Sequence, residues 1–102
     1  MKRIIDGKTY NTETAQKIHE YSRGYAGDFH QFSEALYLTK KGAWFLAGEG
    51  GPMTRYATHH TDGSRSGGED LIVLTPDEAL DYLEHADCDA ETIEFHFQIE
   101  EA

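Results

Sequence analysis

The first residues place apolar positions on either side of Asp6-Gly7. This dipeptide favours a two-residue hairpin, because both central positions of such a turn need a positive φ. Residues 2–10 are therefore predicted to form a short β-hairpin. The segment that follows repeats apolar or aromatic side chains at the spacing of one helical face: Thr14, Ile18, Tyr21 and Tyr25. With Asn11 or Thr12 as its cap, this segment is predicted to form an α-helix.

The middle of the chain predicts two adjacent strands. Residues 32–39 and 43–47 are apolar on both faces and flank a glycine-containing turn at 40–42. Strands of this kind belong in the centre of a sheet, and the short apolar run at 71–74 is expected to add another buried strand. Residues 48–69 contain six of the ten glycines and are predicted to form a long irregular loop that offers a second contact surface.

A capping box marks the start of a helix at Thr75. The Thr75 side chain is expected to accept from the amide of Glu78, whose own side chain reaches back, and Pro76 lies where no amide donor is needed. The buried stripe of this helix consists of Ala79, Leu80, Leu83 and Ala86. The helix is expected to end near Asp87.

The last segment fits two structures. Ile93, Phe95, Phe97 and Ile99 alternate with polar residues as in a strand, but they also form i,i+4 pairs. Asp89 is a good N-cap for the residues that follow, which favours a short helix over a strand.

Together these elements predict an α+β fold in one domain, residues 1–102, because a chain of 102 residues has the length of a single domain. We expect a small antiparallel sheet with an N-terminal hairpin and helix, followed by one or two acidic C-terminal helices.

Charge is distributed unevenly along the chain. Residues 1–65 hold all nine Lys and Arg together with seven acids, whereas residues 66–102 hold twelve acids and no Lys or Arg. Such a block repels nucleic acid and attracts basic surfaces, and the attraction weakens as salt is added. A nucleic-acid-binding protein is a fitting partner, although an acidic face that only promotes solubility explains the same composition.

Residues that could carry chemistry do not assemble into a known motif. The only cysteine, Cys88, follows His85 without the second half of a zinc site, and its acidic surroundings are expected to raise its thiol pKa. Asp87, Asp89 and Glu91 match the start of a calcium loop, but the glycine and the final glutamate of that loop are missing. No metal, cofactor or catalytic residue is predicted.

One enzymatic alternative remains open. His59 and His60 share the glycine-rich loop with Arg55 and Arg65, and a metal-independent ribonuclease needs a histidine pair and a cation for the phosphate. The basic half also interleaves cations with aromatic residues, as single-stranded RNA binding requires, although these rings also suit a core. The alternative function is therefore an RNA-binding protein or ribonuclease.

The sequence also predicts the compartment. A single cysteine excludes an intramolecular disulfide, and the N-terminus meets charged residues before any signal-like apolar stretch. No apolar run approaches the roughly 20 residues of a membrane helix. A cytoplasmic protein without membrane contact is expected.

Three stretches carry a resemblance to a known group of proteins. They are KRIIDGKTYNTETA at 2–15, LYLTKKGAWFLAGEGGPM at 36–53, and GGE at 67–69 with LTPDEA at 74–79. These stretches resemble small proteins of bacterial plasmids, phages and other mobile elements, several of which are described as anti-CRISPR proteins that act on the type II RNA-guided nuclease. The resemblance implies a non-enzymatic inhibitor in a bacterial host that blocks guide-RNA loading or complex assembly. It also suggests the guide RNA as a second partner, because a relative with an added domain acts on it.

The binding residues are predicted from charge. We expect a surface of carboxylates to occupy the basic nucleic-acid groove of the CRISPR effector nuclease, as phosphates do. Its residues are Asp77, Glu78, Asp81, Glu84, Asp87, Asp89, Glu91 and Glu94.

Overall fold

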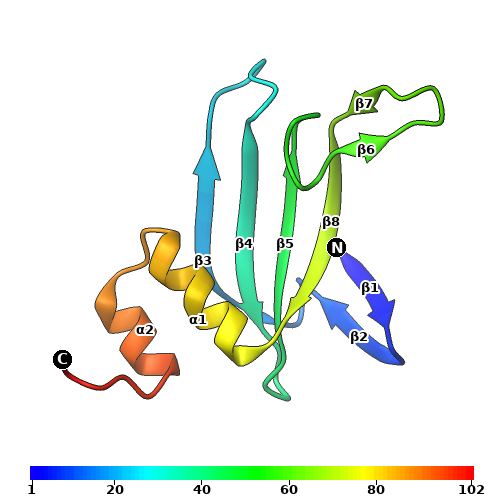
Figure 1. Cartoon of the computed structure of the whole chain (residues 1–102). Helices are drawn as coiled ribbons and strands as arrows, with labels where there is room; N and C mark the ends of the chain where they lie inside the picture. Colours follow the sequence, from blue (N-terminus) through cyan, green and yellow to red (C-terminus); the bar gives the residue numbers. More distant parts are fainter.

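Antiparallel strands form the centre of the molecule, and the computed structural model describes all of residues 1–102 (Figure 1). The main sheet has the order β3-β4-β5-β8. Its strands are β3 (Gln16–Arg23), β4 (Phe32–Leu38), β5 (Trp44–Gly50) and β8 (Gly68–Leu74). Two small hairpins and two helices complete the chain: β1 (Lys2–Ile5) with β2 (Lys8–Asn11), β6 (Thr58–His59) with β7 (Arg65–Ser66), α1 (Pro76–His85) and α2 (Ala90–His96). This architecture confirms the α+β class.

The two strands expected in the centre of the sheet lie there. β4 pairs with β5, and the register places Leu36 opposite Leu46 and Leu46 opposite Ile72. These apolar side chains form one continuous row across three strands, because residues in register share a face of the sheet. The N-terminal hairpin is also confirmed, with Asp6 at φ 52° and Gly7 at φ 74° in its turn.

The helix predicted after the first hairpin is wrong, because these residues form the edge strand β3. β3 pairs with β4 along its length, with a register shift between Lys17 and His19. The bulge turns two consecutive side chains to the helix side of the sheet: Ile18 packs against the main core, and His19 Nε2 lies 2.6 Å from the carbonyl oxygen of Ala86. A bulged strand thus reproduces the i,i+3 spacing that favoured a helix.

The irregular loop expected at 48–69 is shorter than predicted. β5 continues to Gly50 and β8 already begins at Gly68, and the small hairpin of β6 and β7 lies between them. Gly48 lies inside β5, where the side chain of Tyr56 packs directly against the strand. A Cβ at this position would lie 2.5 Å from Cζ and Oη of Tyr56, so only glycine leaves room for the ring.

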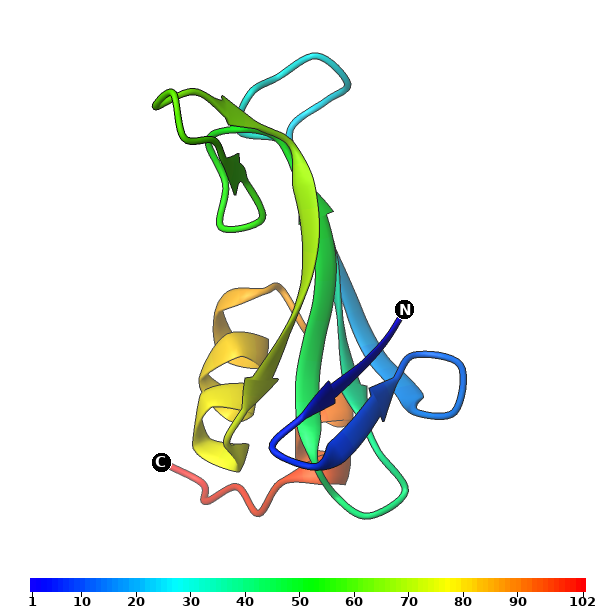
Figure 2. The same ribbon diagram turned by 90° about the vertical axis from the view of Figure 1, so that its right-hand side faces the viewer.

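Opposite faces of the sheet carry different elements. α1 lies on one face, where Leu36, Trp44 and Leu46 form a core with Ala79 and Leu83. The β1–β2 hairpin lies on the other face, where a second core contains Tyr10, Phe45 and Leu71 (Figure 2). The sheet therefore separates the acidic helices from the N-terminal hairpin.

Both helices begin as the sequence indicates. The amide of Glu78 donates to Thr75 Oγ1 over 3.1 Å and the amide of Thr75 donates to Glu78 Oε1 over 2.8 Å, so the capping box is confirmed. The side chain of Asp89 accepts from the amide of Thr92 and caps α2, which confirms the helical alternative for this segment. After α2 the chain is extended, and the ring of Phe97 stacks on Trp44 with centroids 5.1 Å apart.

Neither helix has the length and hydropathy that crossing a membrane requires.

Candidate functional site

The predicted acidic residues all belong to the two helices or to the turn that joins them. All eight are exposed: Asp77, Glu78, Asp81, Glu84, Asp87, Asp89, Glu91 and Glu94. None of them forms an ion pair with Lys or Arg; their one ionic contact is His85 Nδ1, 3.6 Å from Asp81 Oδ1. The structure therefore brings these carboxylates to the surface without Lys or Arg partners.

Two of the eight have a structural role. Glu78 is tied into the capping box of α1, and Asp89 caps α2. Hydrogen bonds from the side chain and the backbone of Thr92 hold the pKa of Asp89 below its ordinary value. The remaining six carboxylates, which we term the acidic helical surface, are Asp77, Asp81, Glu84, Asp87, Glu91 and Glu94.

An aromatic side chain accompanies these charges. Phe95 of α2 lies between Glu94 and His96 in the chain and exposes 82 % of its surface. Its ring touches the edge of His96, with centroids 4.9 Å apart, and His96 in turn contacts Trp44. An exposed phenylalanine on a helix anchored to the core is a feature of protein interfaces, whose energetic centres are enriched in aromatic residues.

Three of the nine basic residues lie on the other side of the sheet. Lys2, Arg3 and Lys8 belong to the β1–β2 hairpin, which covers the face opposite α1 (Figure 2). Arg3 pairs with Asp70 of β8. At the end of β3, the pKa of Arg23 is raised mainly by its hydrogen bond to the Tyr21 hydroxyl and to a smaller extent by Asp87. Arg23 thus lies near the turn between the acidic helices, and positive charge occurs on both sides of the sheet.

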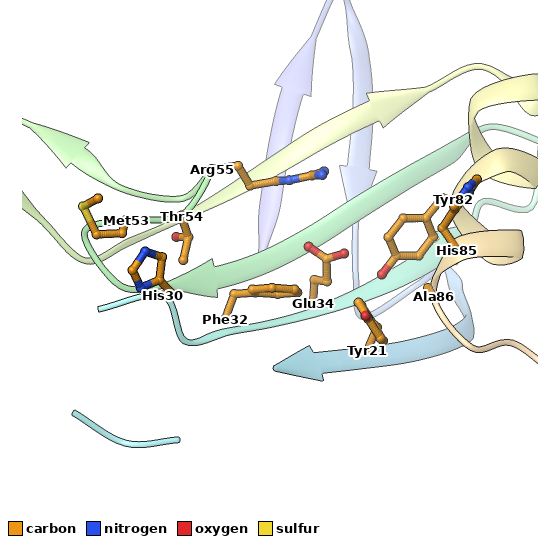
Figure 3. A pocket seen from close by; sticks show the side chains of 10 residues that line it. All are labelled: Tyr21, His30, Phe32, Glu34, Met53, Thr54, Arg55, Tyr82, His85 and Ala86. Atoms are coloured by element: carbon orange, nitrogen blue, oxygen red, sulfur yellow. The ribbon is translucent and has the colours of Figure 1, made fainter. Parts of the chain in front are cut away.

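A second candidate site is a pocket of about 400 Å³ on the helix side of the sheet (Figure 3). It lies between the upper part of β3 and β4, the C-terminal end of α1 and the loop that precedes β6. Glu34 lines it, and only 6 % of this residue is exposed. A buried carboxylate requires hydrogen-bond donors, because transfer of a charge out of water is costly.

Tyr56 supplies one donor to Glu34. Its hydroxyl donates to Glu34 Oε1 over 2.7 Å, and 2 % of the residue is exposed. Burial raises the pKa of Tyr56, and the hydrogen bond to Glu34 adds to this effect, so the phenol stays protonated at neutral pH. Gly48, directly opposite Glu34 on β5, leaves the space that the Tyr56 ring occupies.

Tyr82 of α1 places a second phenol at the pocket. Its hydroxyl is buried and has no hydrogen-bond partner in the protein. Figure 3 shows this hydroxyl directed toward Glu34 and Tyr21. Burial raises the pKa of Tyr82, and Glu34, the acceptor that its hydroxyl approaches without completing a hydrogen bond, raises it further, so this hydroxyl is also a protonated donor at neutral pH. An unpartnered buried donor is costly, which makes this position notable.

The histidine pair of the ribonuclease hypothesis does not converge. His59 pairs with Arg65 across the small hairpin, whereas His60 bonds the hydroxyl oxygen of Ser66 over 2.9 Å. Arg65 and Ser66 are neighbours in β7 and point to opposite faces, so His59, opposite Arg65, and His60, bonded to Ser66, lie on different sides of the ribbon. Arg55 lines the Glu34 pocket instead.

No group of three or more His, Cys, Asp or Glu side chains is arranged to hold a metal ion. Cys88 is partly buried, and burial, followed by the charge of Asp89, raises the pKa of its thiol. The thiolate needed for nucleophilic chemistry is therefore disfavoured.

No protein-family model, curated protein or solved structure matches this chain.

The sequence pattern does not predict this pocket, but one residue of the pocket stands out in the sequence. Glu34 is a charged residue within a strand expected to be apolar on both faces and central in the sheet. Such a position buries the carboxylate and requires a partner. The partner itself, Tyr56, lies 22 residues away in a glycine-rich loop, and no local pattern connects the two.

Proposed function

We propose that this protein is an anti-CRISPR-like inhibitor that binds a type II RNA-guided nuclease through the acidic helical surface. The bound inhibitor blocks guide-RNA loading or complex assembly in the bacterial cytoplasm and catalyses no reaction. The partner's contact is its basic nucleic-acid-binding groove. The resemblance of residues 2–15 and 36–53 to proteins of mobile elements supplies the identity of the partner, and the surface chemistry supports the mode of binding.

The observation that carries this proposal is the absence of Lys and Arg partners for six exposed carboxylates on the two helices and the turn that joins them. Asp77, Asp81 and Glu84 follow the i, i+4, i+7 spacing of one side of α1, so a negative charge recurs roughly every 5–6 Å along it. A rigid row of charges of this kind is complementary to a groove lined with Lys and Arg.

Phe95 supplies an apolar group within this charged surface. It is 82 % exposed, the highest value among the large hydrophobic side chains of the chain. At an interface the same ring buries apolar area next to the ionic contacts, which is where binding energy is concentrated. We therefore place Phe95 within the contact, beside Glu91 and Glu94 of the same helix.

The test is a charge reversal with a matched control. The surface variant combines Asp81→Lys, Glu84→Lys and Glu94→Lys. The control combines Glu13→Lys, Glu49→Lys and Glu69→Lys, which are exposed acids outside the two helices and change the net charge by the same amount. Each variant is measured for binding to the guide-free nuclease and for inhibition of target cleavage, with circular dichroism as the control for folding.

The surface variant is expected to lose inhibition and to bind at least about tenfold more weakly, because several interfacial ion pairs become repulsive. The control variant should stay close to the unmodified protein. Phe95→Ala should weaken binding by a similar factor without a change in charge. Full inhibition by the surface variant, or equal losses in the two charge variants, would contradict the proposed surface.

A further inference from the structure

The pocket around Glu34 combines three chemical features that the acidic helical surface does not use. The first is an available acceptor. Glu34 Oε1 receives the hydroxyl of Tyr56, while Oε2 makes no hydrogen bond within the protein. A ligand that enters the pocket therefore meets a carboxylate that is held in place and ready to accept N–H donors.

The second feature is a set of aromatic walls. Tyr21, Phe32 and Tyr82 line the pocket, and the rings of Tyr21 and Phe32 lie 5.8 Å apart with 58° between their planes. Figure 3 shows these rings around the carboxylate of Glu34. Aromatic walls beside a fixed acceptor favour a planar heterocycle, because the ring gains stacking contacts while its edge reaches the polar group.

The third feature is positive charge at the rim. Arg55 lines the pocket, is exposed and forms no ion pair within the protein. In Figure 3 the Arg55 side chain extends over the pocket above Glu34. An unpaired guanidinium disfavours a simple cationic ligand and favours one that carries an anionic group beside its ring.

We infer that this pocket binds guanine nucleotides, with the edge of the base at Glu34, its ring among Tyr21, Phe32 and Tyr82, and its phosphate at Arg55. Guanine is the base that presents a ring N–H and an exocyclic amino group side by side to one carboxylate. Adenine and cytosine place a ring acceptor beside their amino group, and uracil flanks its single N–H with carbonyl oxygens, so each sets an acceptor against the Glu34 carboxylate.

The Tyr82 hydroxyl completes this match. It is a buried donor without a partner, directed toward Glu34. The carbonyl oxygen of guanine lies next to the N–H donors that a carboxylate binds, so a donor beside Glu34 has an acceptor to meet. Ligand binding would then satisfy a group that is costly to leave unpaired in the free protein.

The same chemistry occurs in a free guanine nucleotide and in a guanine of single-stranded RNA. Both present the base edge and an adjacent phosphate. The inference does not depend on the acidic helical surface, which uses other residues.

The test is calorimetric titration of the full chain with GMP, AMP, CMP, UMP and guanosine, repeated with Glu34→Gln, Tyr82→Phe and Arg55→Ala. Glu49→Gln is the matched control, since Glu49 is an exposed acid on the neighbouring strand and does not line this pocket. The oligonucleotides AAGAA and AAAAA are titrated in parallel, and circular dichroism verifies the fold of each variant.

GMP is expected to bind at least about tenfold more tightly than the other three nucleotides, the discrimination of a good bidentate contact. Glu34→Gln should remove that preference, Glu49→Gln should keep it, and Arg55→Ala should make GMP no tighter than guanosine. Tyr82→Phe, which removes a hydroxyl without a partner in the protein, should fold normally and bind GMP several-fold more weakly.

Tighter binding of AAGAA than of AAAAA and GMP would identify RNA as the source of the base, and binding of GMP without AAGAA would identify the free nucleotide; either result supports a guanine pocket. Equal affinity for all four nucleotides, no detectable binding of GMP, or a GMP preference that survives Glu34→Gln in a folded protein would overturn the inference. Binding of methylguanidinium without GMP would overturn it as well and indicate a site for cationic side chains.

Discussion

Replacing Tyr56 by Phe is expected to destabilise the protein by about 2 kcal/mol. The ring and its packing remain, so the change removes one hydroxyl that donates to Glu34 over 2.7 Å. Hydrogen bonds to a charged group contribute about 1.5–3 kcal/mol, and a buried carboxylate that loses its donor incurs the desolvation cost of that group. Because Glu34 borders a pocket that water can enter, we expect a value in the lower half of this range.

Urea unfolding at neutral pH measures this loss. With a slope of about 1–2 kcal/mol per molar urea for a chain of this size, the midpoint should fall by about 1–2 M. Tyr10→Phe is the matched control, because Tyr10 is also buried, at 6 % exposure, and its hydroxyl has no side-chain hydrogen bond. That variant should change stability by less than about 0.5 kcal/mol, as expected for a substitution without one of the named destabilising mechanisms.

Tyr82→Phe provides the opposite expectation. Its hydroxyl is buried without a partner, so its removal should leave stability unchanged or increase it. If Tyr56→Phe is as stable as the unmodified protein, the hydrogen bond to Glu34 does not form in solution and the reasoning fails. If Tyr82→Phe is instead the costly substitution, Tyr82 is the donor that holds Glu34.

Three further results are expected. Gly48→Ala should lower the free energy of unfolding by about 1–3 kcal/mol, because the added Cβ would lie 2.5 Å from the Tyr56 ring. Thermal unfolding measures this loss, and an unchanged midpoint would show that the loop containing Tyr56 does not pack on β5. Thr75→Ala should cost about 1 kcal/mol through loss of the capping box, whereas Thr75→Ser should restore it; equal stability of the two variants in urea would argue against the cap. The carboxyl of Asp89 should titrate below its ordinary pKa of 3.8, owing to its hydrogen bonds from Thr92. Because the pKa of Asp89 is lower in the folded protein, its hydrogen bonds stabilise the fold above the ordinary pKa, and this stabilisation is lost as the pH falls through the folded pKa. Asp89→Asn should therefore remove that part of the pH dependence of folding stability. A pKa at or above 3.8, measured for this carboxyl by carbon-13 NMR, would contradict the expectation.

Local signals predicted the elements whose causes are local. The Asp6-Gly7 turn and the Thr75 capping box each depend on a few adjacent residues, and both are present. The central position of β4 and β5 also followed from their composition, because strands that are apolar on both faces must be covered on both.

The edge strand β3 shows where a local pattern misleads. Ile18 and Tyr21 are three residues apart, and both face the helix side, which is the spacing of a helix. The bulge at Lys17 and His19 produces the same spacing within a strand. Which structure forms depends on the pairing partner β4, and pairing between distant segments cannot be read from one segment alone.

The Glu34 pocket is harder to predict from the sequence. Its carboxylate is a charge within an apolar strand, but its donor, Tyr56, comes from a distant loop, and the neighbouring hydroxyl of Tyr82 comes from a helix, and these segments meet only in the folded chain. Gly48 is a second example. The glycines of this region predict irregular structure, whereas Gly48 lies within a strand and creates space for the buried ring of Tyr56. The exposure of the acidic helical surface was easier to predict, since charged side chains are seldom buried without a partner and residues 66–102 contain no Lys or Arg.

The most direct test of the proposed function is binding of the purified protein to a guide-free type II nuclease at low and at high salt, with guide RNA added before or after the protein. Contacts between exposed charges are screened over about 10 Å at 0.1 M salt and about 3 Å at 1 M. The account predicts tight binding at low salt that is lost at high salt and prevented when guide RNA is bound first. Binding that is insensitive to salt and unaffected by prior guide RNA, or no binding under either condition, would contradict it.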